Sequence, residues 1–262
     1  MPIKLHPLVA VALLAFSPAL ALAAANPWDG TWLIKPGSYK TTGKPDSYLL
    51  IKGLYTCGSC NPKYTVKADG KDHAITGSAY VDTVAVTIVN DRTIQLISAQ
   101  NTKVVVQGRR TVSTDGKTML SDFTNYMGAK EAHFSMTSQR VAPGPAGSHA
   151  ISGEWRDTAD TQISDTGRTM IIASTAKGMK LTWNGAVVDA EFGGPPVLQT
   201  NYPGHVMVAL KKLGERTIEE TDTIKDKVSD VIRYELSADG KSITVVDEDK
   251  LHGQRIDYVM TK

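Results

Sequence analysis

A block of 36 residues occurs twice in the chain, and this repeat constrains the fold more than any other feature. Residues Val84–Met119 align without a gap with Val208–Ile243, each residue pairing with the one 124 positions later, and 12 of the 36 pairs are identical. Solenoid repeats are only about 20 to 50 residues long. The spacing therefore predicts two copies of one domain.

The N-terminal segment has the composition of an export signal. Lys4 precedes an apolar run, Leu8–Phe16, and small residues follow up to Ala25. This order is typical of a signal peptide, and the run is shorter than the about 20 residues of a membrane-spanning helix. We expect residues 1–25 to be a signal peptide and the mature protein to be periplasmic or secreted, with no membrane span.

The repeat divides the remaining chain into two domains. Residues 26–141 are expected to form the first domain and residues 151–262 the second, each beginning with Gly-x-Trp. Residues 142–150 contain prolines and glycines without charge or periodicity, which is typical of a short linker. Each copy is long enough to bury a core of its own.

Both copies show alternating apolar and polar residues. Val84, Val86 and Ile88 share one face in the first copy, as do Ile232 and Tyr234 in the second. A period of two predicts half-buried strands, and Asp-Gly and similar pairs between them predict hairpin turns. We expect an all-β protein of two tandem antiparallel up-and-down barrels, with about eight strands each, because a closed sheet leaves no exposed edge.

Charge and composition exclude some partners. The formal net charge is only +2, and acidic and basic residues are interspersed. Nucleic-acid binding needs a basic stripe or patch, so we expect no nucleic-acid partner. A Gly-rich phosphate loop and a dinucleotide fingerprint are also missing from the sequence, so no cofactor is expected.

The Gly-x-Trp starts resemble the lipocalin signature. In lipocalins this Trp, here Trp32 and Trp155, closes the base of a small barrel, and an Arg from the last strand lies across it. The resemblance implies that Arg140 plays this part in the first copy. The second copy departs from the pattern, because its last residue is Lys262.

A longer likeness covers nearly the whole mature chain. Trp28-x-Gly-Thr-Trp32 and Ser113-x-Asp-Gly-Lys-Thr118 are similar to motifs of an exported bacterial tandem-domain family of unknown function. The resemblance implies export and the same domain boundaries. It implies no activity and no catalytic residues.

Cys57 and Cys60 are the only cysteines. In an exported chain a Cys-x-x-Cys pair favours a small structural disulfide. A redox role would need the first Cys at a helix N-terminus, and Pro62 and a predicted strand follow instead. A zinc site would need two further ligands.

Other candidates for chemistry are weak. Gly147-Ser148-His149 places a Ser beside a His, but it lies in the linker and not at a strand-to-helix turn. The acidic runs Glu219–Asp222 and Asp247–Asp249 lack the order of a calcium loop. We interpret them as solvated hairpin tips or strand edges, and we expect no catalytic or metal-binding residues.

The aromatic residues allow two interpretations. They could fill the barrel cores or line an apolar cavity, and an eight-stranded barrel is compatible with both. We expect an exported non-catalytic binding module with a small apolar ligand in a barrel. The alternative is a structural or interaction protein of the envelope that binds another exported protein through its outer surface. The aromatic residues concerned are Trp28, Trp32, Trp155, Trp183, Tyr48, Tyr80, Tyr202 and Tyr234.

Overall fold

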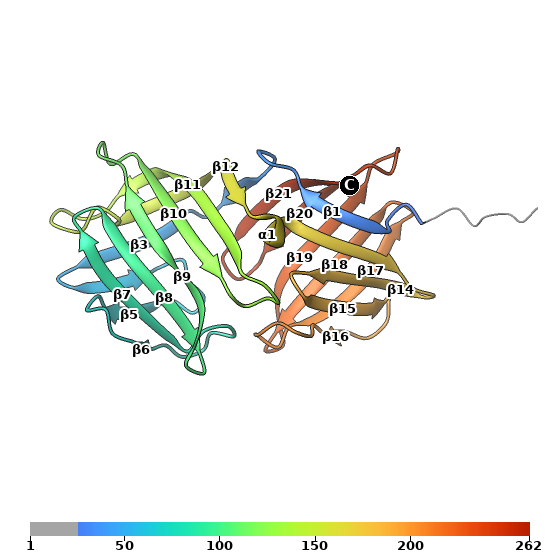
Figure 1. Cartoon of the computed structure of the whole chain (residues 1–262), viewed down its shortest axis with the longest axis horizontal. Coiled ribbons are helices and arrows are strands. Elements are labelled where there is room, and N and C mark those ends of the chain that lie inside the picture. Colours follow the sequence, from blue (N-terminus) through green and yellow to red (C-terminus); the bar gives the residue numbers. More distant parts are fainter. Residues whose placement is uncertain (1–25) are drawn as a thin grey trace, which may run out of the picture.

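The computed structural model describes residues 26–262, which form two tandem antiparallel β-barrels (Figure 1). The predicted fold class is therefore confirmed. The predicted signal peptide, residues 1–25, lies outside the described residues. The sheets contain ten and eleven strands, more than the about eight predicted, because several short strands leave no clear pattern in the sequence.

The sheet of the first barrel has the order β5-β4-β3-β12-β11-β10-β9-β8-β7-β6. Its strands are β3 (Asp46–Ile51), β4 (Leu54–Cys57), β5 (Tyr64–Lys67), β6 (His73–Ala74), β7 (Thr83–Asn90), β8 (Thr93–Gln100), β9 (Lys103–Val112), β10 (Thr118–Asn125), β11 (Ala132–Pro143) and β12 (Gly153–Ile163).

The sheet of the second barrel has the order β15-β14-β13-β1-β21-β20-β19-β18-β17-β16, and β2 pairs with β21. A four-residue helix, α1 (Asp165–Arg168), precedes β13. The strands are β1 (Gly30–Ile34), β2 (Lys40–Gly43), β13 (Thr169–Ser174), β14 (Gly178–Trp183), β15 (Ala186–Glu191), β16 (Val197–Leu198), β17 (Met207–Gly214), β18 (Thr217–Ile224), β19 (Lys227–Leu236), β20 (Ser242–Asp249) and β21 (Gln254–Thr261).

Short bridges bring the ends of each sheet together. In the second barrel Val187 of β15 and Thr200, just after β16, exchange two backbone hydrogen bonds of 3.0 and 2.9 Å. In the first barrel the amide of Gly70 donates to the carbonyl of Val86 in β7 (2.9 Å). Each sheet is thus nearly closed.

The two barrels exchange a strand. β1 pairs with β13 and β21 in the second barrel, and β12 pairs with β3 and β11 in the first. In Figure 1 the blue strand β1 lies among the orange and red strands of the second barrel. β2 also belongs to the second barrel, through its pairing with β21. The expectation that residues 26–141 and 151–262 each form a complete barrel is therefore wrong for β1, β2 and β12. Both β1 and β12 begin with Gly-x-Trp.

The predicted linker lies against the first barrel. Its first residues, Ala142 and Pro143, extend β11. The amide of His149 donates to the carbonyl of Leu50 (2.8 Å), and the amide of Leu50 donates to the Ser152 hydroxyl (2.9 Å). The chain enters β12 from this packed position.

Turn chemistry is the same in the two copies. Asn101 and Thr102, between β8 and β9, have φ of 50° and 65°, and their counterparts Lys225 and Asp226 have 50° and 63°. Two consecutive residues with positive φ form the hairpin turn that matches the twist of antiparallel strands. Both copies therefore have a hairpin turn at this position.

Each barrel encloses its own apolar core, because alternate residues of its strands point inward. Trp155, Ile94 and Met119 are buried in the first barrel, and Trp32, Ile243 and Met260 in the second. Between Asn26 and Lys262 the structure holds no helix of the length and apolarity needed to cross a membrane.

Candidate functional site

A tryptophan and a cation pack together in each barrel. The guanidinium carbon of Arg140 lies 4.0 Å from the centre of the Trp155 ring, and the Lys262 ammonium lies 4.6 Å from that of Trp32. Each indole N–H donates to the carbonyl four residues earlier (2.9 Å for Trp155, 2.8 Å for Trp32). The two tryptophans belong to the cores, and neither pair lines the cavity described below.

The lipocalin-like expectation for Arg140 needs a correction. The resemblance places Arg140 across Trp32 of its own copy, but strand exchange brings it over Trp155 of the other copy. Its guanidinium also donates to the carbonyls of Ser152 and Ala150 (2.7 Å each). Sequence order alone could not reveal this pairing.

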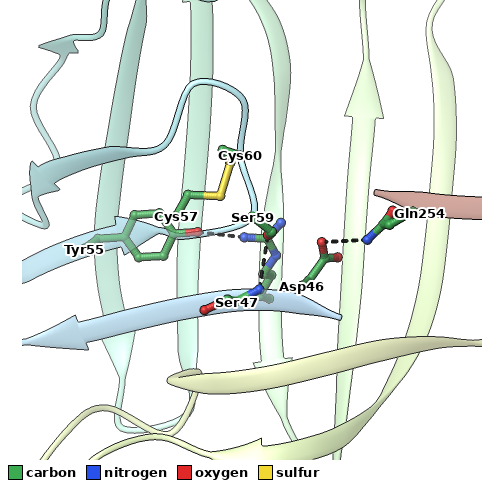
Figure 2. The surroundings of a disulfide bond; sticks show 8 residues. Asp46, Ser47, Tyr55, Cys57, Ser59, Cys60 and Gln254 are labelled. Atoms are coloured by element: carbon green, nitrogen blue, oxygen red, sulfur yellow. Dashed lines mark hydrogen bonds between the residues drawn. A yellow bond between two sulfur atoms is a disulfide. The ribbon is translucent and has the colours of Figure 1, made fainter. Parts of the chain in front are cut away.

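Cys57 and Cys60 form a disulfide at the end of β4 (Figure 2). Cys57 is buried within the first core. The adjoining Ser59 hydroxyl accepts a hydrogen bond from the amide of Ser47 in β3 (3.1 Å). The disulfide thus fixes a loop that packs against the neighbouring strand, and Cys57 lies on a strand rather than at a helix N-terminus.

The second barrel contains a cavity of about 390 Å³. This volume lies toward the lower end of the about 300–1,000 Å³ of small-molecule sites. A crevice of about 250 Å³ adjoins it, because Ile34, Tyr39 and Ile163 line both spaces. Asp165 and Arg168 of α1 also line this crevice.

Aromatic side chains from both barrels line the cavity. They are Tyr39, Tyr80, Phe134, Trp183, Tyr202, Tyr234 and Tyr258. Of the aromatic residues singled out in the sequence, Tyr80, Trp183, Tyr202 and Tyr234 thus line a cavity. The others, Trp28, Trp32, Trp155 and Tyr48, are core residues.

The first barrel covers part of the cavity in the second. Tyr80 precedes β7, and its ring meets that of Tyr202 edge-on with centroids 6.3 Å apart. A Cβ at Gly204 would overlap with the Tyr80 ring, so the two loops pack closely because Gly204 has no side chain. The β10–β11 loop is fixed by Asn184, whose carbonyl accepts the Ala129 amide (2.7 Å).

Polarity increases along the inner face of the second barrel. The register places Leu236 beside Ile243 in one row and Tyr234 beside Val245 in the next. Ile232 lies between Glu220 and Asp247 in the third row. The acidic third row lines the cavity, and Met170, Leu181 and Val188 of β13, β14 and β15 also line it. The cavity therefore has an apolar part and an acidic end.

Three carboxyl groups, those of Glu220, Asp222 and Asp247, line the acidic end. Glu220 is only 5 % exposed, and its Oε2 accepts a hydrogen bond from the Tyr234 hydroxyl (2.7 Å). The buried Oδ1 atoms of Asp222 and Asp247 have no hydrogen-bond partner. Buried polar atoms are ordinarily paired, since an unpaired one costs free energy.

Burial raises the pKa of all three carboxyl groups, because a desolvated carboxylate is disfavoured. The pKa of Asp247 rises to about 7, through burial first and then the charges of Asp230 and Asp249. The pKa values of Glu220 and Asp222 are also raised, chiefly by burial. The neighbouring carboxyl group of Glu220 raises the pKa of Asp222 further.

Other titratable groups face this cluster from neighbouring strands. Burial raises the pKa of Asp230 on β19, and a hydrogen bond to Asp249 raises that of His252. Burial likewise raises the pKa of the phenols of Tyr39, Tyr80, Tyr234 and Tyr258. His252 forms its hydrogen bond with Asp249. The titratable neighbours of the three lining carboxyl groups are therefore mainly carboxyl groups and phenols.

The equivalent positions in the first barrel are not acidic. At the constant offset of the repeat, Glu220, Asp222 and Asp247 correspond to Leu96, Ser98 and Phe123. In the first barrel Arg110 takes the place of Tyr234. Its guanidinium lies 4.0 Å from the centre of the Tyr48 ring and donates to the Tyr55 hydroxyl (2.8 Å). The first interior is thus occupied by a cation, and the second holds carboxyl groups and a cavity.

The interpretation of both acidic runs as solvated tips or edges is wrong for three of their side chains. Alternation along β18 points Glu219 outward, where it pairs with Arg233, and turns Glu220 inward. Asp247 lies in mid-strand on β20, facing the cavity. A comparison of the two copies at inward-facing positions would have revealed that Glu220 stands at the position of Leu96 and Asp247 at that of Phe123.

The sequence predicts no grouping suited to catalysis or metal binding. Across residues 26–262 no cluster of three or more His, Cys, Asp or Glu side chains is placed to hold a metal ion. His149 lies in the loop before β12, where its ring hydrogen-bonds to the carbonyl of Asn90 (2.7 Å).

Comparison with known proteins gives no family assignment. No protein-family model matches the chain, and searches of curated proteins and of solved structures find no match.

Proposed function

We propose that this protein is an exported, non-catalytic binding module that holds a small, largely apolar ligand in the second barrel. The observation that carries the proposal is the cavity of about 390 Å³ and its aromatic lining. Binding sites for small molecules are concave and mostly apolar, with a few polar groups that orient the ligand. The cavity has this composition.

The position of the cavity supports the same function. It lies inside one barrel and is partly covered by Tyr80 and Phe134 from the other. A ligand held there would lose most of its contact with water, which favours binding of apolar surface. Export is supported by the composition of residues 1–25 and by the disulfide, which is typical of oxidising compartments.

Native mass spectrometry of protein purified from its own host tests the proposal. We expect a fraction of the protein to carry a non-covalent small molecule. A chain that carries no such molecule, and also fails to bind the neutral apolar dye N-phenyl-1-naphthylamine, would contradict the proposed function.

A cavity-filling variant provides the matched control. Ala186 is buried on β15 and lines the cavity, so Ala186→Phe places a ring in the space. The variant is expected to lose the bound mass and the dye signal. Overpacking costs about 1–3 kcal/mol, so an unchanged far-ultraviolet circular dichroism spectrum must show that the barrel remains folded.

A further inference from the structure

We propose that the ligand of the second barrel is a protonated amine with an apolar body, whose ammonium group binds at Asp222 and Asp247. This inference rests on the proposed function and adds the chemical class of the ligand. It rests on the mixture of apolar and acidic residues that line the cavity, on the buried carboxyl oxygens without a partner, and on the contrast with the first barrel.

The cavity offers acceptors for N–H donors. Oδ1 of Asp222 and Oδ1 of Asp247 are buried without a partner, and both side chains line the cavity. An ammonium group is a donor with three N–H bonds and no acceptor. An ammonium bound at this end of the cavity would donate to the carboxyl groups of these two side chains.

The remainder of the lining suits the body of such a ligand. Met170, Leu181 and Val188 supply apolar surface, and Tyr234 and Trp183 supply aromatic rings. Aromatic faces attract a cation within about 6 Å of the ring centre. An aliphatic or aromatic amine matches both parts of the cavity, whereas an anion would meet carboxyl groups at its charged end.

The first barrel holds a cation in the corresponding part of its interior. There Arg110 lies against Tyr48 and Tyr55, with an internal cation among aromatic rings. In the second barrel Tyr234 occupies the position of Arg110, and two carboxyl-bearing residues, Glu220 and Asp247, replace Leu96 and Phe123. The second interior thus has aromatic rings and acids, and a ligand would supply the cation.

Isothermal titration calorimetry with three probes of similar size tests the inference. The purified protein is titrated at pH 7.5 with 2-phenylethylamine, which is a cation at this pH, with neutral 2-phenylethanol and with anionic 3-phenylpropionate. We expect the amine to bind at least tenfold more tightly than the alcohol, since a charge-assisted hydrogen bond contributes roughly this much. The anion is expected to bind most weakly.

Two substitutions locate the charge that is recognised. Asp247→Asn is expected to weaken binding of 2-phenylethylamine on the order of tenfold and to leave the affinity for 2-phenylethanol within about twofold. Asp122→Asn is the matched control, because Asp122 is exposed on β10 of the first barrel. It should change neither affinity.

The outcomes separate this inference from the proposed function. Equal affinities for amine and alcohol, or an unchanged amine affinity in Asp247→Asn, would overturn the ammonium site and leave the apolar pocket intact. Tighter binding of the anion would also overturn it. Failure of all three probes, with the dye bound normally, would overturn the inference alone, and failure of the dye as well would overturn both.

Discussion

Arg140 and Trp155 stack with a separation of 4.0 Å between the guanidinium carbon and the ring centre, although they belong to different copies of the repeat. The contact exists because β12, which carries Trp155, completes the first barrel beside β11, which carries Arg140. The corresponding contact in the second barrel joins Lys262 to Trp32. The exchanged strands therefore contribute to each core through their tryptophans.

A double-mutant cycle measures this pairing. Arg140→Ala combined with Trp155→Phe is expected to show a coupling free energy of about 0.5–2 kcal/mol, the range for a cation over an aromatic face. Arg140→Ala combined with Trp32→Phe should show additive effects. Urea unfolding supplies the free energies, and coupling to Trp32 instead of Trp155 would contradict the strand exchange.

Cleavage of the chain between the copies tests the exchange in another way. A protease site inserted between Gly147 and Ser148 lies in a loop, where a Cβ at Gly147 would meet nothing within 4 Å. After cleavage the two pieces are expected to elute together in size-exclusion chromatography, because each contains a strand of the other barrel. Two pieces that separate as folded monomers would show that each copy is complete by itself.

The sequence predicts the strands of both barrels but not their exchange. Alternation at Val84, Val86 and Ile94 fixes which face is buried, and this local pattern does not depend on the partner strand. Which of the strands β1 and β12 joins which barrel does depend on the partner strand. Because Gly30-Thr-Trp32 and Gly153-Glu-Trp155 place the same glycine and the same tryptophan at the start of each strand, the local sequence does not decide which barrel each strand joins.

The candidate site is only partly predictable for a related reason. The aromatic composition marks Tyr80, Trp183, Tyr202 and Tyr234 as candidate cavity residues, but the acidic runs have the pattern of solvent-exposed groups. The sequence shows a run of acids around Glu220, and only the strand register reveals which of them face inward. The role of Tyr80 depends on how the barrels pack, which no local pattern encodes.

The stability of the second barrel should decrease as the pH rises. The pKa of Asp247 is about 7 in the native state, raised from its ordinary value of 3.8, which applies to the unfolded chain. Between these values the native protein holds a proton that the unfolded chain has released. This contribution is fully present below about pH 4 and is lost as the pH rises through about 7. Urea unfolding at pH 5 and pH 8 measures the change.

The variant Asp247→Asn isolates this effect. It should raise the free energy of unfolding by about 1–3 kcal/mol at pH 8, since it removes a poorly solvated charge, and the gain should shrink at pH 5. Asp122→Asn, on the exposed face of β10, should stay within about 0.5 kcal/mol at both values. An Asp247→Asn variant that is less stable than the wild type at pH 8 would argue against a buried, unpaired carboxyl group.

Reduction of the Cys57–Cys60 disulfide should destabilise the first barrel. Closing a loop of this length contributes about 2 kcal/mol on the chain-entropy model. Dithiothreitol is therefore expected to shift the urea midpoint of the wild type downward. The double variant Cys57→Ala and Cys60→Ala should show the lower urea midpoint without dithiothreitol and no further shift with it. An unchanged midpoint of the wild type in dithiothreitol would contradict a stabilising role for the disulfide.

Removal of the aromatic cover should weaken ligand binding without unfolding either barrel. Tyr80→Ala takes away the ring that the first barrel contributes beside Tyr202, and we expect roughly tenfold weaker binding of 2-phenylethylamine. Tyr126→Ala is the control, because Tyr126 also lies on the first barrel but is not among the cavity-lining residues. Equal losses in both variants would point to a general destabilisation.

A crystal structure of the protein with 2-phenylethylamine tests most directly whether the second barrel holds a ligand by its charge. We expect the phenyl ring among Met170, Leu181 and Trp183, and the nitrogen within hydrogen-bonding distance of a carboxyl oxygen of Asp222 or Asp247. An empty cavity at saturating amine, or an amine bound with its nitrogen directed away from both carboxyl groups, would contradict the account.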